Sequence, residues 1–178
     1  MEAVVFLAAE VSPVEAEASA AAAQEGAGKR MKKLFSISPM PKIDHDRVVA
    51  AIKASELKTS GEIRVVLAWR KASDAVAAAR RQFERLGMTR TRYRNGVLVF
   101  LAPRSRTFAV IGDTGVHEKC GDDFWRELTA SMGQYFKRGE FTAGLVHGIE
   151  RAGSLLAEHF PYEPGDCNEL PDSIEEIK

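Results

Sequence analysis

Acidic residues, glycines and a histidine crowd the segment Val110–Trp125, which reads VIGDTGVHEKCGDDFW. Ca²⁺ takes roughly 6–8 oxygen ligands from carboxylates, backbone carbonyls and water, and a glycine-broken loop offers such carbonyls. Mg²⁺ uses fewer protein ligands and keeps more of its water. The segment therefore suggests a divalent-cation site, for Ca²⁺ rather than Mg²⁺, with Asp113, Asp122 and Asp123 as candidate ligands.

The same residues also have a simpler structural explanation. Asp122 or Asp123 can cap the N-terminus of a helix that begins near Phe124, and carboxylates are favoured at that end of a helix. Gly112 and Gly115 can form an ordinary turn. Both the cation site and the capping role remain open at this point.

Three apolar runs predict the strands that lead up to this segment. They are Glu62–Trp69, Asn95–Pro103 and Thr107–Asp113. The polar link Arg104–Arg106 is too short for a crossover, so the second and third strands must be antiparallel. The first two strands are expected to be parallel, joined by a right-handed crossover.

Apolar residues at helical spacing, together with capping signals, predict four helices. Their sequence segments are 44–61, 73–87, 122–136 and 142–160. The order helix, strand, helix, strand, strand, helix, helix predicts the α/β class. We expect a three-layer α/β/α sandwich with a small mixed sheet and helices on both faces.

This topology brings distant segments to one edge of the sheet. The first two strands begin at that edge and the third ends there, so Glu62, Asn95 and Asp113 are expected to share it. Carboxylates brought together repel one another, which raises their pKa values unless a cation compensates. We therefore predict a metal site whose ligands are Glu62, Asp113, Asp122 and Asp123, assisted by Asn95 and by loop carbonyls.

Composition limits the classes of function. The 178 residues carry 25 Lys and Arg against 25 Asp and Glu, a balance that argues against a strongly basic nucleic-acid binder. No apolar run approaches the roughly 20 residues of a membrane span. Two cysteines, Cys120 and Cys167, do not make a disulfide scaffold. We expect a cytoplasmic monomer with an unidentified protein partner.

The two ends of the chain differ from its middle. Residues 15–28 are rich in Ala, Glu and Gly without an apolar face, and Met31 followed by two lysines looks like a translation start. We expect residues 1–40 to be a disordered or spurious extension, with residues 1–30 lying upstream of the native start. Residues 41–162 form the α/β/α domain, and residues 163–178 form an acidic tail.

Arginines crowd the second predicted helix and the ends of the strand that follows it. They are Arg80, Arg81, Arg85, Arg90, Arg92, Arg94, Arg104 and Arg106. A solvated helix face explains them, and an anionic partner is the alternative. The acidic tail is expected to dock partly on this face through contacts that salt weakens.

Several segments together resemble the TPM-domain family. They are TSGEIRVVL, FERLGM, RNGVLVFLA, FAVIGDTGVHEKCGDDFW, MGQYFKRGEFTAGLVHGIERAGSLLAEHFP and NELPDSI, spread over about 43–174. The resemblance implies an α/β/α sandwich with an acidic cleft at one sheet edge; some members are linked to Ca²⁺ binding and others carry an acid-phosphatase label. By position, Glu62 lies in the family's Gly-Glu-Ile motif, Asp113 at its strand end, and Asp122 and Asp123 at its helix start.

Two functions follow from these observations. The favoured one is a non-enzymatic cation-binding module that helps to assemble or maintain a partner complex. The alternative is a metal-assisted acid phosphatase acting on phosphomonoesters, in which His117 serves as acid or base. A third interpretation makes the arginine-rich face an adaptor surface and leaves the acidic residues as helix caps.

Overall fold

The computed structural model describes residues 5–10, 41–165 and 168–178, and only the backbone of the first of these ranges. Within these ranges, ten elements follow one another. They are β1 (Val5–Glu10), α1 (His45–Glu56), β2 (Glu62–Ala68), α2 (Ala75–Arg85), the 3₁₀ helix η1 (Met88–Arg90), β3 (Gly96–Ala102), β4 (Thr107–Gly112), α3 (Thr114–Lys137), α4 (Phe141–His159) and β5 (Ile174–Ile177).

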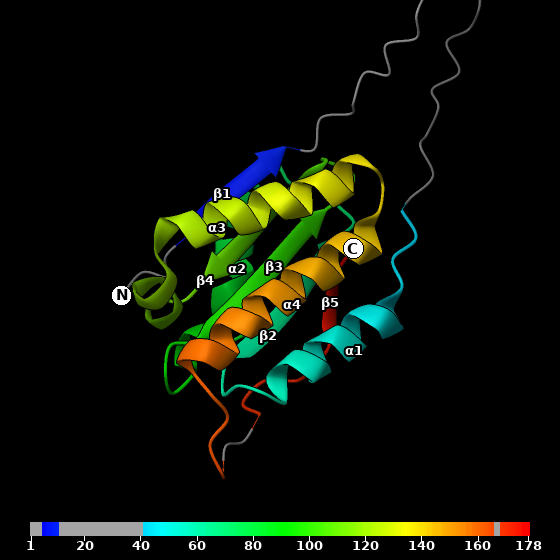
Figure 1. The fold of residues 1–178 in the computed structure, drawn as a ribbon. Helices are drawn as coiled ribbons and strands as arrows, with labels where there is room; N and C mark the ends of the chain where they lie inside the picture. Colours follow the sequence, from blue (N-terminus) through cyan, green and yellow to red (C-terminus); the bar gives the residue numbers. More distant parts are fainter. Residues whose placement is uncertain (1–4, 11–40, 166–167) are drawn as a thin grey trace, which may run out of the picture.

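The five strands form one mixed sheet in the order β1-β4-β3-β2-β5 (Figure 1). The predicted parallel pair is β2 with β3, and the predicted hairpin is β3 with β4. Strand β1 lies antiparallel to β4 at one edge, and β5 lies parallel to β2 at the other. The short link between β3 and β4 therefore sets the strand directions as expected.

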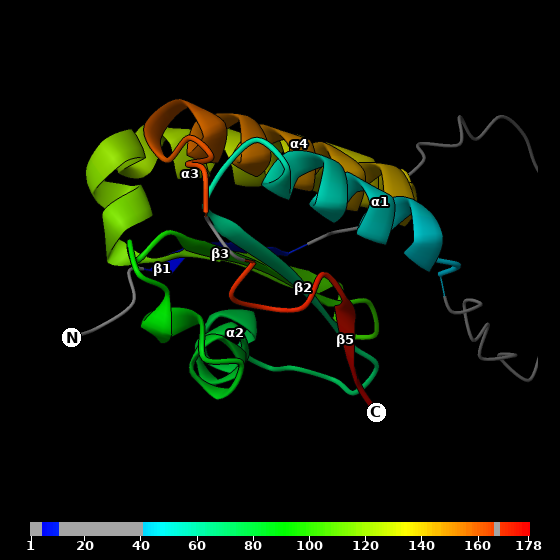
Figure 2. The same ribbon diagram turned by 90° about the horizontal axis from the view of Figure 1, so that it is seen from below.

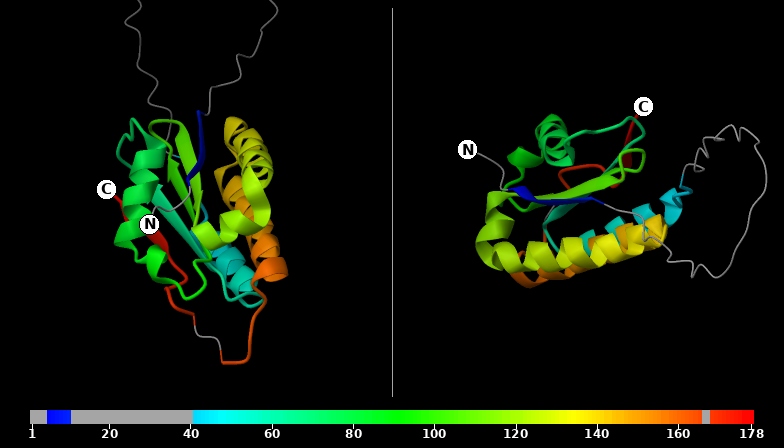
Figure 3. Two further views of the ribbon diagram at one scale, coloured as in Figure 1. Left: turned by 90° about the vertical axis from the view of Figure 1, so that its left-hand side faces the viewer. Right: turned by 90° about the horizontal axis from the view of Figure 1, so that it is seen from above.

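Helices cover both faces of the sheet, which confirms the predicted three-layer α/β/α sandwich. Helices α1, α3 and α4 lie on one face, and α2 lies on the other (Figures 2 and 3). Side chains of β2 alternate between two cores: Ile63, Val65 and Leu67 pack under α1, α3 and α4, whereas Val66 and Ala68 pack under α2. A strand buried on both faces explains the continuous apolar run in the sequence.

Aspartate side chains cap the N-termini of the first two helices. Asp44 caps α1 by accepting a hydrogen bond from the Arg47 amide at 3.1 Å. Asp74 caps α2 by accepting from the Ala77 amide at 2.9 Å.

The third predicted helix, 122–136, corresponds to the second part of α3. Helix α3 joins two helices across a kink: the first is capped by Asp113 and begins at Thr114, and the second follows Gly121 and includes the predicted start near Phe124. Gly121 interrupts α3 with a left-handed φ of 63°, a conformation that glycine adopts without the steric penalty of a side chain. The segment between β4 and Gly121, expected to be a loop, is thus a short helix that ends in a bend.

The two ends of the chain supply the edge strands. Of the extension expected over residues 1–40, Val5–Glu10 forms β1 beside β4, and the rest lies outside the described residues. Part of the predicted acidic tail forms β5, and its Glu175 Oε1 lies 2.6 Å from Arg85 Nη2 on α2. No helix in the described ranges is long and apolar enough to cross a membrane.

Candidate functional site

Distant segments meet at one edge of the sheet, the lower rim in Figure 1. Glu62 opens β2 and pairs with Gly96 at the start of β3. The Asp113 amide, at the end of β4, donates to the Gly96 carbonyl at 2.9 Å. Asn95 lies between them and donates from Nδ2 to the Ser60 carbonyl at 2.9 Å. The backbone thus converges at this rim as the strand directions predict.

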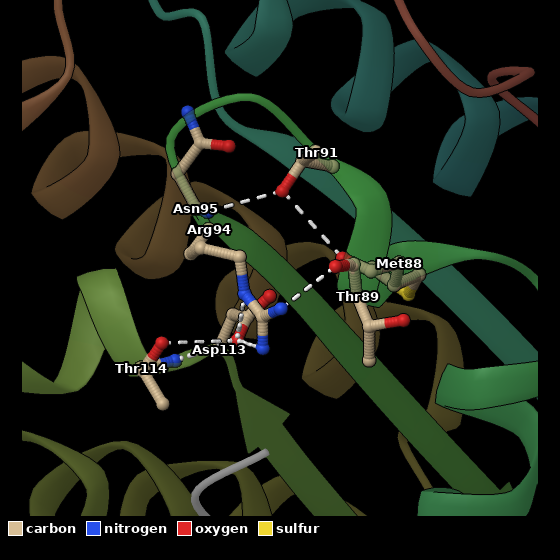
Figure 4. Close-up of polar contacts among 7 residues, drawn as sticks. All are labelled: Met88, Thr89, Thr91, Arg94, Asn95, Asp113 and Thr114. Atoms are coloured by element: carbon tan, nitrogen blue, oxygen red, sulfur yellow. Dashed lines mark hydrogen bonds and ion pairs between the residues drawn. The ribbon is translucent and has the colours of Figure 1, made fainter. Parts of the chain in front are cut away.

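The Asp113 side chain is already engaged at this rim (Figure 4). It is fully buried, and its Oδ1 accepts from Arg94 Nε at 3.0 Å, from Arg94 Nη2 at 2.8 Å and from the Thr114 amide at 2.7 Å. Arg94 also donates from Nη1 to the Thr89 carbonyl at 2.8 Å. Asp113 therefore holds a buried ion pair and a helix cap, and a cation bound here must compete with Arg94.

Asp122 and Asp123 lie at the bend of α3 with side chains that are 63% and 88% exposed. Asp122 Oδ1 lies 3.9 Å from His117 Nε2, and Asp123 Oδ1 lies 2.6 Å from Arg126 Nη2. Within the described ranges, no three His, Cys, Asp or Glu side chains gather as they would around a metal ion. The joint site of Glu62, Asp113, Asp122 and Asp123 therefore stays a prediction.

A pocket of about 430 Å³ opens at the same rim beside Glu62. It lies where the last turn of α1, the start of β2 and the chain after α4 come together. We call it the rim pocket. Its lining includes Lys53, Glu56, Leu57, Glu62, Tyr162 and Asp172.

The acidic side chains of the rim pocket are incompletely satisfied. Glu62 is only 3% exposed, and its Oε1 accepts from the Glu169 amide at 2.8 Å. Its Oε2 is buried and has no hydrogen-bond partner among the residues that the structure describes. Glu56 Oε1 accepts from the Ile63 amide at 2.8 Å, and its Oε2 is buried without a hydrogen-bond partner among the residues that the structure describes.

Burial and mutual repulsion therefore raise the pKa values of Glu56 and Glu62. Burial raises the pKa of Glu56 to about 9, helped by the neighbouring Asp172 side chain. Burial likewise raises the pKa of Glu62 to about 7, although the amides of Glu169 and Leu170 act in the opposite direction. Acids with strongly raised pKa values in a cleft are candidates for functional residues.

Two further features set the charge of the rim pocket. Helix α1 ends at Glu56, so the negative end of its dipole adds about 0.3–1 kcal/mol in favour of a cation. Lys53 lines the pocket, and Arg64 is buried on β2, where it donates from Nη1 to the Pro171 carbonyl. Burial lowers the pKa of Arg64. These basic groups thus offset part of the negative charge that the carboxyl groups carry when ionised.

These pKa shifts predict that the metal-free protein loses stability as the pH rises. The unfolded chain has glutamate pKa values near 4.5, so the folded state binds extra protons at Glu56 and Glu62 above that pH. The resulting stabilisation is complete below pH 4.5 and is lost as the pH rises towards 9. Glu56→Gln places a permanently neutral side chain at this position, so its Tm should fall less than that of the wild type as the pH rises.

Thermal unfolding in EDTA from about pH 6 to about pH 9 measures this decline. Glu150→Gln, which changes an exposed carboxylate on α4, is the matched control and should follow the wild type. Parallel Tm curves for Glu56→Gln and the wild type would show that Glu56 does not retain its proton in the folded state.

The comparisons with known proteins place the chain among bacterial relatives. The model of the TPM domain matches residues 40–155. The BA42 protein of the psychrophilic bacterium Bizionia argentinensis is 40% identical with a TM-score of 0.69, over 74% of this chain and 91% of that one. The N-terminal domain of the cg2496 protein of Corynebacterium glutamicum is 19% identical with a TM-score of 0.47, over 72% and 75%. None of the curated proteins matches significantly.

Proposed function

The chain belongs to the TPM domain family, and we propose that it is a divalent-cation-binding module whose site is the rim pocket. One observation carries the proposal: the carboxylate of Glu62 is buried with one oxygen, Oε2, that meets no hydrogen-bond donor in the described part of the chain. Burying a charge without a partner is costly, and such groups normally stay neutral or hold a cation. A cation at Glu62 removes that cost.

The ligands proposed here are carboxylate oxygens of Glu56, Glu62 and Asp172, with water completing the shell. The side chains are not gathered at ligand distances beforehand, so the cation must draw them together and displace the proton held by Glu56. Ca²⁺ tolerates such irregular, flexible coordination better than Mg²⁺, which demands near-octahedral geometry. Ca²⁺ is therefore the favoured ion.

Of the four ligands predicted from the sequence, the proposal keeps Glu62 at its centre. Asp113, Asp122 and Asp123 form the alternative ligand set. Each of them already faces a basic side chain: Arg94, His117 or Arg126. Mutagenesis separates the two ligand sets directly.

Calcium titration of the ¹⁵N-labelled full chain is expected to shift the amides of residues 56–62 and 168–172. Glu62→Gln should weaken binding by at least about tenfold, the factor expected for one lost charged ligand. Glu150→Gln is the control and should bind as the wild type does. Loss of binding in Asp123→Asn with full binding in Glu62→Gln would overturn the rim pocket and favour the predicted four-residue site.

Binding should also release protons. A bound cation lowers the pKa values of Glu56 and Glu62 from about 9 and about 7, so calcium affinity should rise from about pH 6 to about pH 9. Calorimetry in two buffers of different ionisation enthalpy counts the released protons.

We assign the module a role in assembly or maintenance of a partner complex. The support is the surface beside the pocket, where Leu57 and Tyr162 expose apolar area of the kind that marks protein interfaces.

A further inference from the structure

The rim pocket combines buried acid with exposed apolar surface. Leu57 is 79% exposed and Tyr162 is 52% exposed, and they are the large hydrophobic side chains classed as exposed in the described ranges. Both line the same pocket as Glu56 and Glu62. The surface thus concentrates its apolar side chains at the mouth of an acidic pocket.

The size of the pocket indicates an occupant larger than an ion. About 430 Å³ falls in the range of pockets that receive organic ligands. A ligand that matches an apolar mouth and an acidic floor carries a positive charge at the end of an aliphatic stem. A lysine side chain has this form, because its methylene groups pack on apolar surface while its ammonium seeks a carboxylate.

The free oxygens favour an ammonium over a guanidinium. In both Glu56 and Glu62 one carboxylate oxygen already accepts a backbone hydrogen bond, from Ile63 and from Glu169 respectively. Each of the two side chains therefore has one remaining oxygen, and neither carboxyl group offers both of its oxygens to a ligand. Arginine binds best to both oxygens of one carboxylate, whereas an ammonium has three donors that reach separate acceptors.

We propose that the rim pocket receives a lysine side chain from a protein partner, with the ammonium at Glu62 Oε2 and the methylene stem between Leu57 and Tyr162. The Tyr162 ring adds a cation–π contact where the ammonium approaches its face. Lys53 and Arg64 oppose the incoming charge, and the carboxyl groups of Glu56, Glu62 and Asp172 face it from the same pocket. A protein, rather than a free amine, is needed to cover the largely exposed Leu57.

The proposed lysine pocket uses the same carboxyl groups as the proposed cation site. One of its consequences rests on that proposed function. Calcium and lysine both need Glu62 Oε2, so they exclude each other, and calcium binding releases the partner. The lysine pocket itself requires no metal ion, which allows the two proposals to be tested apart.

The test is a titration of the ¹⁵N-labelled full chain, in EDTA, with the blocked peptide acetyl-Gly-Ala-Lys-Ala-Gly-amide. A matched peptide carries norleucine in place of lysine, which keeps the stem and removes the charge. Free pentylamine supplies the same stem and ammonium without a peptide. The variants are Glu62→Gln, Leu57→Ser at a position whose side chain is largely exposed, and Glu150→Gln as control.

We expect the lysine peptide to shift the amides of residues 57–62 and Tyr162, and to bind at least about tenfold more tightly than the norleucine peptide or pentylamine. Glu62→Gln and Leu57→Ser should each weaken it by about fivefold or more, and Glu150→Gln should not. Equal binding of the lysine and norleucine peptides, pentylamine binding as tightly as the peptide, or no shifts at about 10 mM peptide overturns the inference.

Calcium titration of the same sample keeps the two proposals distinguishable. Calcium shifts without peptide shifts reject the lysine pocket alone. Peptide shifts without calcium shifts reject the cation function and leave the lysine pocket standing. When both bind, added calcium should reverse the peptide shifts, and peptide shifts that persist in saturating calcium overturn the mutual exclusion.

Discussion

Gly112→Ala is expected to destabilise the protein by about 3 kcal/mol, at the upper end of the cost of overpacking a core. A methyl group at position 112 would lie 2.3 Å from Cζ2 and 2.5 Å from Cη2 of Trp125. Trp125 is fully buried and its ring already meets Phe124 edge-on at 5.3 Å, so moving the ring away from a new methyl group would disturb the core. Urea unfolding monitored by circular dichroism measures the loss.

The same substitution at Gly133 is the matched control and should act in the opposite direction. Its added methyl group finds the Phe108 ring at 4.0 Å, an ordinary contact, and Gly133 lies inside α3. Alanine there is expected to stabilise the protein by up to about 1 kcal/mol, because glycine is a poor helix former.

A rescue experiment identifies the clash. Trp125→Phe removes the ring atoms that Gly112→Ala meets, so the double variant should be more stable than the sum of the two single changes predicts. A Gly112→Ala protein as stable as the wild type would contradict the packing of α3 against β4 described here.

The strand directions were predictable because one short feature controls them. The polar link 104–106 cannot carry a crossover, so β3 and β4 had to be antiparallel, and the apolar runs marked the strands on either side. The edge strand β5 lacked such a signal. Four residues of β5 lie in an acidic segment, and their pairing with β2 joins residues about a hundred positions apart in the chain, which local patterns do not reveal.

The candidate site was only half visible in the sequence. Chain direction brought Glu62 to the rim, but Glu56 and Asp172 reach the pocket from the last turn of α1 and from the segment before β5. One signal for Glu56 was available: an acidic residue at the C-terminal end of a helix is unfavourable unless a proton or a cation offsets it. Nothing comparable distinguishes Asp172 from the other acids around it.

Asp113→Ala is the second substitution with a large expected effect, a loss of about 3 kcal/mol. It removes the cap of α3, which costs roughly 1 kcal/mol, and it leaves the partly buried Arg94 without its carboxylate. Asp113→Asn keeps an oxygen for the Thr114 amide and removes only the charge, so it should cost about half as much. Chemical unfolding of both variants separates the cap from the ion pair.

A double-mutant cycle with Arg94→Met then isolates the pair. Removing both charges should recover part of the loss, because no unpaired guanidinium remains in the half-buried site. The response to calcium tests whether Asp113 is also a metal ligand. If Asp113 acts through Arg94 and α3, Asp113→Asn lowers the unfolding free energy and leaves the calcium-induced rise in Tm as large as in the wild type. A calcium-induced rise that disappears in Asp113→Asn but persists in Glu62→Gln would instead make Asp113 a ligand and move the cation site along the rim.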